Sequence, residues 1–91
     1  MNAAKWEKVE YTFTDEYYQL TDGFFRATIS HSNYYGYLLG IETVEGLVCL
    51  TPNMMIDQGI SLNFKKLRKM QSLGRRLLKE YNDNRNFTLS H

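Results

Sequence analysis

Apolar and polar residues separate most clearly in the stretch from Leu62 to Asn82. At about 100° per residue, its side chains fall on two faces, as they do in an amphipathic helix. The apolar face consists of Phe64, Leu67, Met70, Leu73, Gly74, Leu77, Leu78 and Tyr81. The opposite face carries Lys65, Arg68, Lys69, Arg75, Arg76 and Lys79. The pattern predicts one long helix over residues 62–82, with Ser61 or Asn63 as its N-cap.

Upstream of this helix, the sequence shows the features of β-strands and tight turns. Residues 8–14 alternate strictly between apolar and polar side chains, which indicates a half-buried strand. The Asp22-Gly23 pair separates two further strands and suits a type I′ hairpin turn. Residues 47–51 are apolar on both faces, which is typical of a central strand covered on both sides. The predicted strands are 8–14, 16–21, 24–30, 34–42 and 47–51.

The order of these elements predicts an α+β fold. We expect an antiparallel four- to five-stranded meander sheet, followed by one long C-terminal amphipathic helix packed on one face. Residues 1–91 should form a single domain, with residues 1–7 and 83–91 as flexible or edge segments. The connector 53–61 should be a loop or single turn that fills the open end of the core. Gly74 costs about 1 kcal/mol relative to alanine in a helix, so we expect a strand backbone or an aromatic ring to approach it closely.

The small net charge of +1 hides a strong division of charge along the chain. Residues 1–64 contain three Lys or Arg against eight Asp or Glu, a net −5, whereas residues 65–91 contain eight against two, a net +6. The basic helix face does not serve the helix itself, because like charges at i,i+4, such as Arg75 and Lys79, repel each other. Three interpretations follow: a solvated face, pairing with acids of this chain or of a homodimer, and binding of an anionic partner.

Aromatic side chains are the second feature that suggests a binding surface. The candidates on neighbouring predicted strands are Tyr17, Tyr18, Tyr34, Tyr35 and Tyr37. They cannot all face one core. An exposed group of tyrosines would suit the stacking of single-stranded nucleic-acid bases, or it would anchor a protein interface. A partly hydrated sheet surface is the simplest alternative.

Residues for catalysis or metal binding are scarce. His31 lies between two serines in a predicted turn, which is not the arrangement of a catalytic triad. Cys49, the single cysteine, is expected to be a small buried apolar residue in a strand. The neighbouring acids Asp15 and Glu16 would point to opposite faces of a strand. The sequence therefore predicts a non-catalytic protein with no metal, no cofactor and no small-molecule substrate.

These features predict a small binding module that docks on an anionic partner through the basic helix face, with help from the tyrosine-rich sheet. Nucleic acid is the favoured partner, because its phosphates match a face of one sign. The alternative is a protein-binding inhibitor or regulator, of the anti-defence or immunity type seen in phages and mobile elements, that acts on a nucleic-acid-handling protein. Membrane attachment is disfavoured, because the apolar helix face is needed to cover the sheet. A lone cysteine and the lack of an apolar leader favour the cytoplasm.

Overall fold

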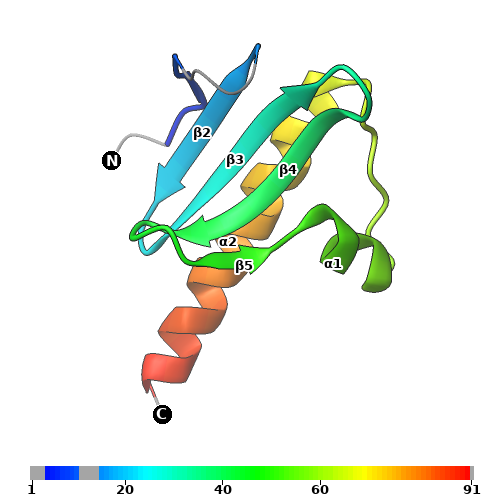
Figure 1. Cartoon of the computed structure of the whole chain (residues 1–91). Helices are drawn as coiled ribbons and strands as arrows, with labels where there is room; N and C mark the ends of the chain where they lie inside the picture. The colour runs from blue at the N-terminus through cyan, green and yellow to red at the C-terminus, as the bar shows by residue number, and fades with distance from the viewer. Residues whose placement is uncertain (1–3, 11–14, 91) are drawn as a thin grey trace.

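The computed structural model describes residues 4–10 and 15–90, of which residues 85–90 are described by their backbone alone. These residues form a sheet and a long helix that lies across one face of it (Figure 1). The elements in chain order are β1 (Glu7–Lys8), β2 (Tyr17–Asp22), β3 (Phe25–Ser32), β4 (Gly36–Thr43), β5 (Val48–Leu50), α1 (Pro52–Asp57) and α2 (Leu67–Ser90).

The described strands form one five-stranded antiparallel sheet in the order β1-β2-β3-β4-β5. Each strand pairs with its neighbours in the sequence, and α2 packs mainly against β3 and β4. The predicted α+β fold, a meander sheet followed by a C-terminal helix on one face, is therefore confirmed. The first strand differs from the prediction, since β1 covers two residues only and residues 11–14 of the predicted strand 8–14 lie outside the described residues.

The β2–β3 turn consists of Gly23 and Phe24, because Asp22 pairs with Phe25 across the two strands. The predicted turn at Asp22-Gly23 is therefore one position too early. Gly23 has a φ of +63°, and among the described residues no residue other than glycine has a positive φ. A positive φ at the first central position alone is the pattern of a type II′ turn rather than the predicted type I′ turn. Type II′ suits this sequence because only one of the two turn residues is glycine.

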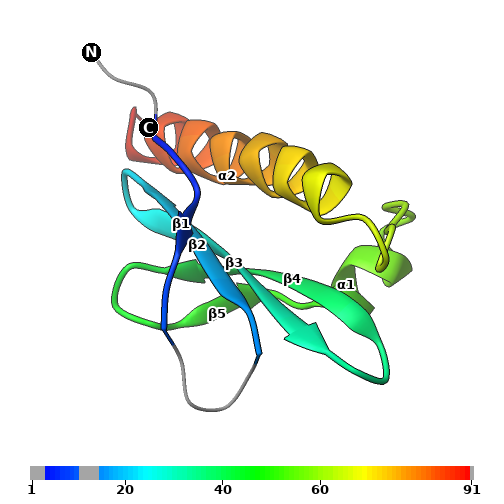
Figure 2. The ribbon, with the colours of Figure 1, turned by 90° about the horizontal axis from the view of Figure 1, so that it is seen from above.

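The core lies between α2 and the face of the sheet that the helix covers (Figure 2). Alternate strand residues such as Ala27, Ile29 and Leu39 point to this face and are fully buried. The helix contributes Met70 and Leu78 from its apolar face. The other buried core residues are Leu20, Phe25, Ile41, Leu50, Met55 and Leu77. Because the apolar face of α2 is used in this way, the opposite face of the helix points away from the sheet.

β5 lies at the edge of the sheet, so the prediction that residues 47–51 form a central strand is wrong. Within the described part of the chain, β5 pairs with β4 alone. Leu50 is buried in the core, but Leu47 and Val48 are 71% and 63% exposed. An apolar run without alternation does not distinguish a covered strand from an edge strand with an apolar outer surface. The sheet therefore ends in an apolar edge.

The connector after β5 contains the short helix α1. The side-chain oxygen of Thr51 accepts a hydrogen bond from the backbone N–H of Met54 at 3.2 Å, and Pro52 occupies the first helical turn, as both residue types favour. Met55 is fully buried, whereas Met54 and Ile56 are exposed. The connector agrees with the expected single turn at the end of the core, with Met55 as the residue that fills the space.

α2 begins at Leu67, later than the predicted helix. Asn63, one of the two predicted caps, instead accepts a hydrogen bond from the backbone N–H of Lys65 at 3.3 Å and so stabilises a separate turn. The carbonyl oxygen of Phe64 accepts a hydrogen bond from the backbone N–H of Tyr37 at 2.7 Å. Since this carbonyl is turned toward the sheet, it cannot serve the hydrogen-bond ladder of the helix. A contact with β4 therefore sets where the helix begins.

The C-terminal end of α2 also differs from the prediction, because the helix continues past Asn82 to Ser90. Residues 83–90, which were predicted to belong to a flexible or edge segment, are part of this helix. Among the residues that the structure describes, no helix is long and apolar enough to cross a membrane.

Gly74 lies where α2 is in close contact with both the N-terminal segment and the sheet. A Cβ atom at this position would lie 2.9 Å from a ring carbon of Trp6 and 2.9 Å from a methyl carbon of Leu39. Both distances are shorter than ordinary van der Waals contact. The expected close approach of an aromatic ring to Gly74 is therefore present, and the ring belongs to Trp6.

Candidate anion-binding ridge

Five of the six cations predicted for the basic helix face lie on the solvent-facing side of α2. We call these five residues the basic ridge: Arg68, Lys69, Arg75, Arg76 and Lys79, all of them exposed. Lys65 is also exposed, but it precedes α2 and lies in the turn that Asn63 stabilises. It therefore stands at the entrance to the ridge rather than on the helix face where the sequence pattern placed it.

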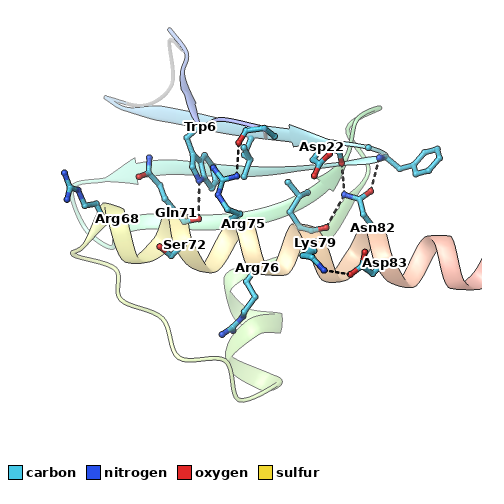
Figure 3. Close-up of a pocket in the computed structure, with 15 residues that line it drawn as sticks. Trp6, Asp22, Arg68, Gln71, Ser72, Arg75, Arg76, Lys79, Asn82 and Asp83 are labelled. Atoms are coloured by element: carbon cyan, nitrogen blue, oxygen red, sulfur yellow. Dashed lines mark hydrogen bonds and ion pairs between the residues drawn. The ribbon is translucent and has the colours of Figure 1, made fainter. Parts of the chain in front are cut away.

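A groove runs along each side of the basic ridge. The first groove, of about 1040 Å³, lies between α2, the N-terminal segment and the β2–β3 turn (Figure 3). The second groove, of about 860 Å³, lies between α2 and residues 59–63. Arg68, Ser72 and Arg76 line both grooves. Their spacing of four residues places them in one row along the helix, so they form the crest between the grooves.

Two hydrogen bonds hold the N-terminal segment on α2, where it forms a wall of the first groove (Figure 3). The indole N–H of Trp6 donates to the backbone carbonyl of Gln71 at 3.2 Å. The guanidinium of Arg75 donates to the backbone carbonyl of Ala4 at 2.8 Å. A carbonyl carries no net charge, so this contact positions Arg75 without neutralising it. The wall of the groove therefore includes an immobilised but still exposed cation.

Asn82 joins α2 to the β2–β3 turn at the other end of the first groove (Figure 3). Its amide nitrogen donates to the carbonyl of Asp22 at 2.7 Å and to that of Leu78 at 3.2 Å. Its amide oxygen accepts from the backbone N–H of Phe24 at 3.1 Å. Sequence reasoning did not identify this residue, because an asparagine at the end of a predicted helix gives no sign of a partner 60 residues away. The contact fixes the turn relative to the ridge.

The positive charge of the ridge is largely uncompensated. Within the described residues, Lys79 is the only ridge cation in an ion pair, with Asp83 at 3.0 Å, and both side chains are exposed. Such a pair along a helix contributes about 0.3–0.5 kcal/mol. The first turn of α2 contains no acid. Arg68 and Lys69 lie in this turn, at the positive end of the helix dipole, and each destabilises the helix by about 0.3–1 kcal/mol. With no acid beside them, their charges add to the positive potential at this end of the ridge.

Two of the five candidate tyrosines bind a carboxylate of the same chain. The hydroxyl of Tyr18 donates to Glu16 at 2.6 Å, and that of Tyr37 donates to the other carboxylate oxygen at 3.2 Å. The hydrogen bond to Glu16 is the main cause that raises the pKa of Tyr18 to about 12. The same bond is the main cause that lowers the pKa of Glu16. Burial, followed by the charge of Glu16, raises the pKa of Tyr37.

Replacing Glu16 with glutamine should therefore lower the pKa of Tyr18 from about 12 toward the ordinary tyrosine value of about 10. The neutral amide still accepts a hydrogen bond but no longer repels a tyrosinate. A raised pKa stabilises the folded state below the ordinary tyrosine pKa, and this contribution is lost as the pH rises toward 12. The wild-type chain should thus lose more stability over this alkaline range than Glu16→Gln.

An absorbance titration of tyrosinate formation tests this expectation, with Glu45→Gln in the exposed β4–β5 turn as the control. Glu16→Gln should move the titration of Tyr18 to lower pH, and that of Tyr37 to a smaller extent, because burial is the main cause of the raised pKa of Tyr37. Glu45→Gln should leave the titration unchanged. Identical alkaline titrations for wild type and Glu16→Gln would contradict the assignment of Glu16 as the partner of Tyr18.

The other three candidate tyrosines lie on different surfaces. Tyr34 and Tyr35 form part of the β3–β4 turn and are 93% and 70% exposed. Tyr17 is half-buried on the face of the sheet opposite α2, because its neighbour Tyr18 pairs with the inward-facing Ile29. The five tyrosines therefore do not form one continuous aromatic surface.

The residues considered for catalysis lie apart from the ridge. His31 belongs to β3 rather than to a turn, and its ring centroid is 4.8 Å from that of Tyr37. One ring nitrogen of His31 is 4.0 Å from the carboxylate of Asp15. Cys49 is half-buried in β5. No group of three metal-ligating side chains converges within the described ranges, 4–10 and 15–90. That the protein is not an enzyme stays a prediction.

Comparison of the chain with known protein families, with curated proteins and with solved structures gave no match. The ridge and its grooves are therefore interpreted from their own geometry and charge.

Proposed function

We propose that this protein binds a negatively charged partner, and specifically a nucleic acid, along the basic ridge of α2. The observation that carries the proposal is the exposure of five cations on one helix face, of which only Lys79 has a carboxylate partner among the described residues. Phosphates release counterions when Lys and Arg neutralise them, and this release supplies most of the affinity of sequence-independent binding. The ridge offers such contacts along α2.

The shape of the ridge supports this assignment. Residues 68 to 79 extend for roughly 16 Å along the helix at 1.5 Å per residue. Grooves on both sides leave the crest residues Arg68 and Arg76 accessible from either flank. In Figure 3 the side chain of Arg76 lies on the side of α2 opposite Trp6, whereas Arg75 bends toward the N-terminal segment. The charges thus spread over a band rather than a single point, as an extended backbone of phosphates requires.

Fluorescence anisotropy with labelled oligonucleotides across a salt series tests the proposal. If all five ridge cations contact duplex DNA, the slope of log K against log salt should lie near −4.5, from about 0.9 per phosphate contact. The variant Arg68→Gln/Lys69→Gln/Arg76→Gln should shrink the slope by about 2.7 and weaken binding at moderate salt by at least about tenfold. These three side chains are exposed, and neutralising Arg68 and Lys69 removes two charges that oppose the helix dipole, so the unfolding midpoint should stay the same or rise slightly.

The control is Lys5→Gln/Lys8→Gln, which removes two exposed cations outside the ridge. It should shift the slope far less than the ridge variant does, per charge removed. Equal effects per charge would show that net charge, and not the ridge, is responsible. An affinity that does not depend on salt would remove the proposal altogether.

A second candidate function, an inhibitor or regulator that binds a nucleic-acid-handling protein, is favoured by the apolar edge at β5. Leu47 and Val48 there, together with Ile56 of α1, are more than half exposed. Exposed apolar patches mark protein–protein contacts, among others, whereas protein–nucleic acid interfaces are more polar and more positively charged than protein–protein interfaces. The discriminating result would be a protein partner that stays bound in a stoichiometric amount after nuclease treatment. Its binding should persist in the ridge variant and be lost in Val48→Asp.

A further inference from the structure

We propose that the β3–β4 turn is a base-stacking site, in which Tyr34 and Tyr35 hold unpaired bases of a single-stranded nucleic acid whose phosphates lie on the basic ridge. This inference rests on the proposed function and names the form of nucleic acid that the protein prefers. Each of the two rings is exposed, at 93% and 70%. The other candidate tyrosines are half-buried, and two of them are bound to Glu16.

The turn that carries the two rings is held in a defined shape. The side-chain oxygen of Ser32 accepts hydrogen bonds from the backbone N–H groups of Tyr34 at 3.2 Å and of Tyr35 at 3.3 Å. Gly36 closes the turn with a φ of +86°. A turn fixed in this way loses little conformational freedom when a ligand binds, which favours binding by its side chains.

The same turn is tied to the entrance of the ridge. The hydrogen bond from Tyr37 to the carbonyl of Phe64, at 2.7 Å, joins β4 to the segment before α2. Tyr35 precedes Tyr37 by two residues, and Lys65 follows Phe64 directly. Since consecutive Cα atoms are about 3.8 Å apart, the Cα atoms of Tyr35 and Lys65 lie within roughly 15 Å of each other. A few nucleotides can therefore contact both the exposed rings and the first cations.

Single strands fit this arrangement better than duplexes do. A tyrosine ring stacks on the face of a base, and in a duplex these faces are already covered by neighbouring base pairs. Proteins that bind single strands combine aromatic rings with a positive surface that follows the backbone, and here Tyr34 and Tyr35 supply the rings while the ridge supplies the charge. The negative backbone and the positive ridge are complementary in charge.

The test uses the full chain and three fluorescent probes of equal length: an oligothymidine, an oligouridine and a DNA duplex. Tyr34→Ala/Tyr35→Ala should weaken binding of the single strands by about 30-fold or more, since the variant removes two rings and each stacked base contributes about 1–3 kcal/mol. It should leave duplex binding and the salt slope unchanged. The control Tyr34→Phe/Tyr35→Phe retains the rings and should bind the single strands like the wild type. The oligothymidine and oligouridine probes distinguish DNA from RNA as the source of the strand.

Several results would overturn the inference. Equal losses for single strands and duplex would show that the rings do not select unpaired bases, and loss with the phenylalanine variant would show that hydroxyl contacts replace stacking. If the ridge variant abolishes binding while Tyr34→Ala/Tyr35→Ala has no effect, the proposed function stands and the stacking site falls. If no probe binds in a salt-dependent manner, both fall. Both tyrosines are exposed, so an unchanged unfolding midpoint should accompany each variant.

Discussion

Replacing Gly36 with alanine is expected to lower the free energy of unfolding by about 2–4 kcal/mol. Gly36 has a φ of +86°, a conformation that costs other residues about 1–3 kcal/mol. A Cβ atom at this position would also overlap the carbonyl oxygen of Phe64. That oxygen belongs to the backbone, so no change of side-chain rotamer relieves the overlap. The hydrogen bond from Tyr37 to the same carbonyl, worth about 1 kcal/mol, would be lost as well.

Denaturant unfolding of Gly36→Ala and Gly59→Ala separates the two causes. Gly59 has a φ of +78°, but apart from its two neighbours in the chain no residue has an atom within 4 Å of where its Cβ would be. It therefore reports the backbone strain alone, and the excess loss in Gly36→Ala measures the contact with Phe64. If both variants lose the same stability, the contact between the β3–β4 turn and the segment before α2 contributes nothing. The turn would then not be held beside the ridge as the stacking site requires.

The sequence was sufficient to predict the orientation of those helices and strands that bury one face. In β3 the alternation of Phe25, Ala27 and Ile29 defines an inner face, and all three residues are buried in the structure. In α2 the apolar face determines the rotation of the helix, and this rotation alone places Arg68 and Arg76 on the solvent side. The exposure of the ridge could therefore be predicted, because it is a consequence of core formation.

The sequence was not sufficient to predict the bounds or the position of an element that depends on residues distant in the chain. The start of α2 depends on the carbonyl of Phe64, which accepts a hydrogen bond from the backbone N–H of Tyr37 in β4. Hydrophobic periodicity carries no information about that hydrogen bond. The position of β5 depends on what lies beyond it, and apolar side chains at Leu47 and Val48 are compatible with either a covered strand or an exposed edge. Both errors arise because local patterns report burial on average and not the identity of the neighbour.

The candidate tyrosines show the same limit for a functional surface. Strand parity places Tyr17 and Tyr18 on opposite faces, but it gives no sign that Glu16 binds Tyr18 and Tyr37. The turn position of Tyr34 was obscured because the predicted turn was placed before it, at residues 31–33, rather than around it. Only the folded arrangement separates the two exposed rings from those engaged within the chain.

Gly74→Leu is expected to destabilise the fold by about 2 kcal/mol. Leucine stabilises a helix by about 0.8 kcal/mol relative to glycine, but overpacking a core costs about 1–3 kcal/mol. The cost should fall near the upper end here, because Leu39 is fully buried and the ring of Trp6 is rigid. Ser72→Leu, on the exposed crest of the same helix, is the matched control and should change the stability very little.

Trp6→Ala should cost about 3 kcal/mol, the lower end of the range for such truncations, because Trp6 is only partly buried. It removes the ring that presses on Gly74 and the hydrogen bond from Trp6 to Gln71 at 3.2 Å. In the double variant Trp6→Ala/Gly74→Leu, the leucine can occupy the space that the ring leaves. The double variant should therefore lose less stability than the sum of the losses in the two single variants. A double-mutant cycle of denaturant unfolding should give a coupling energy of about 1–2 kcal/mol. Strict additivity would show that Trp6 does not determine why glycine stands at position 74, and that Leu39 alone makes the contact.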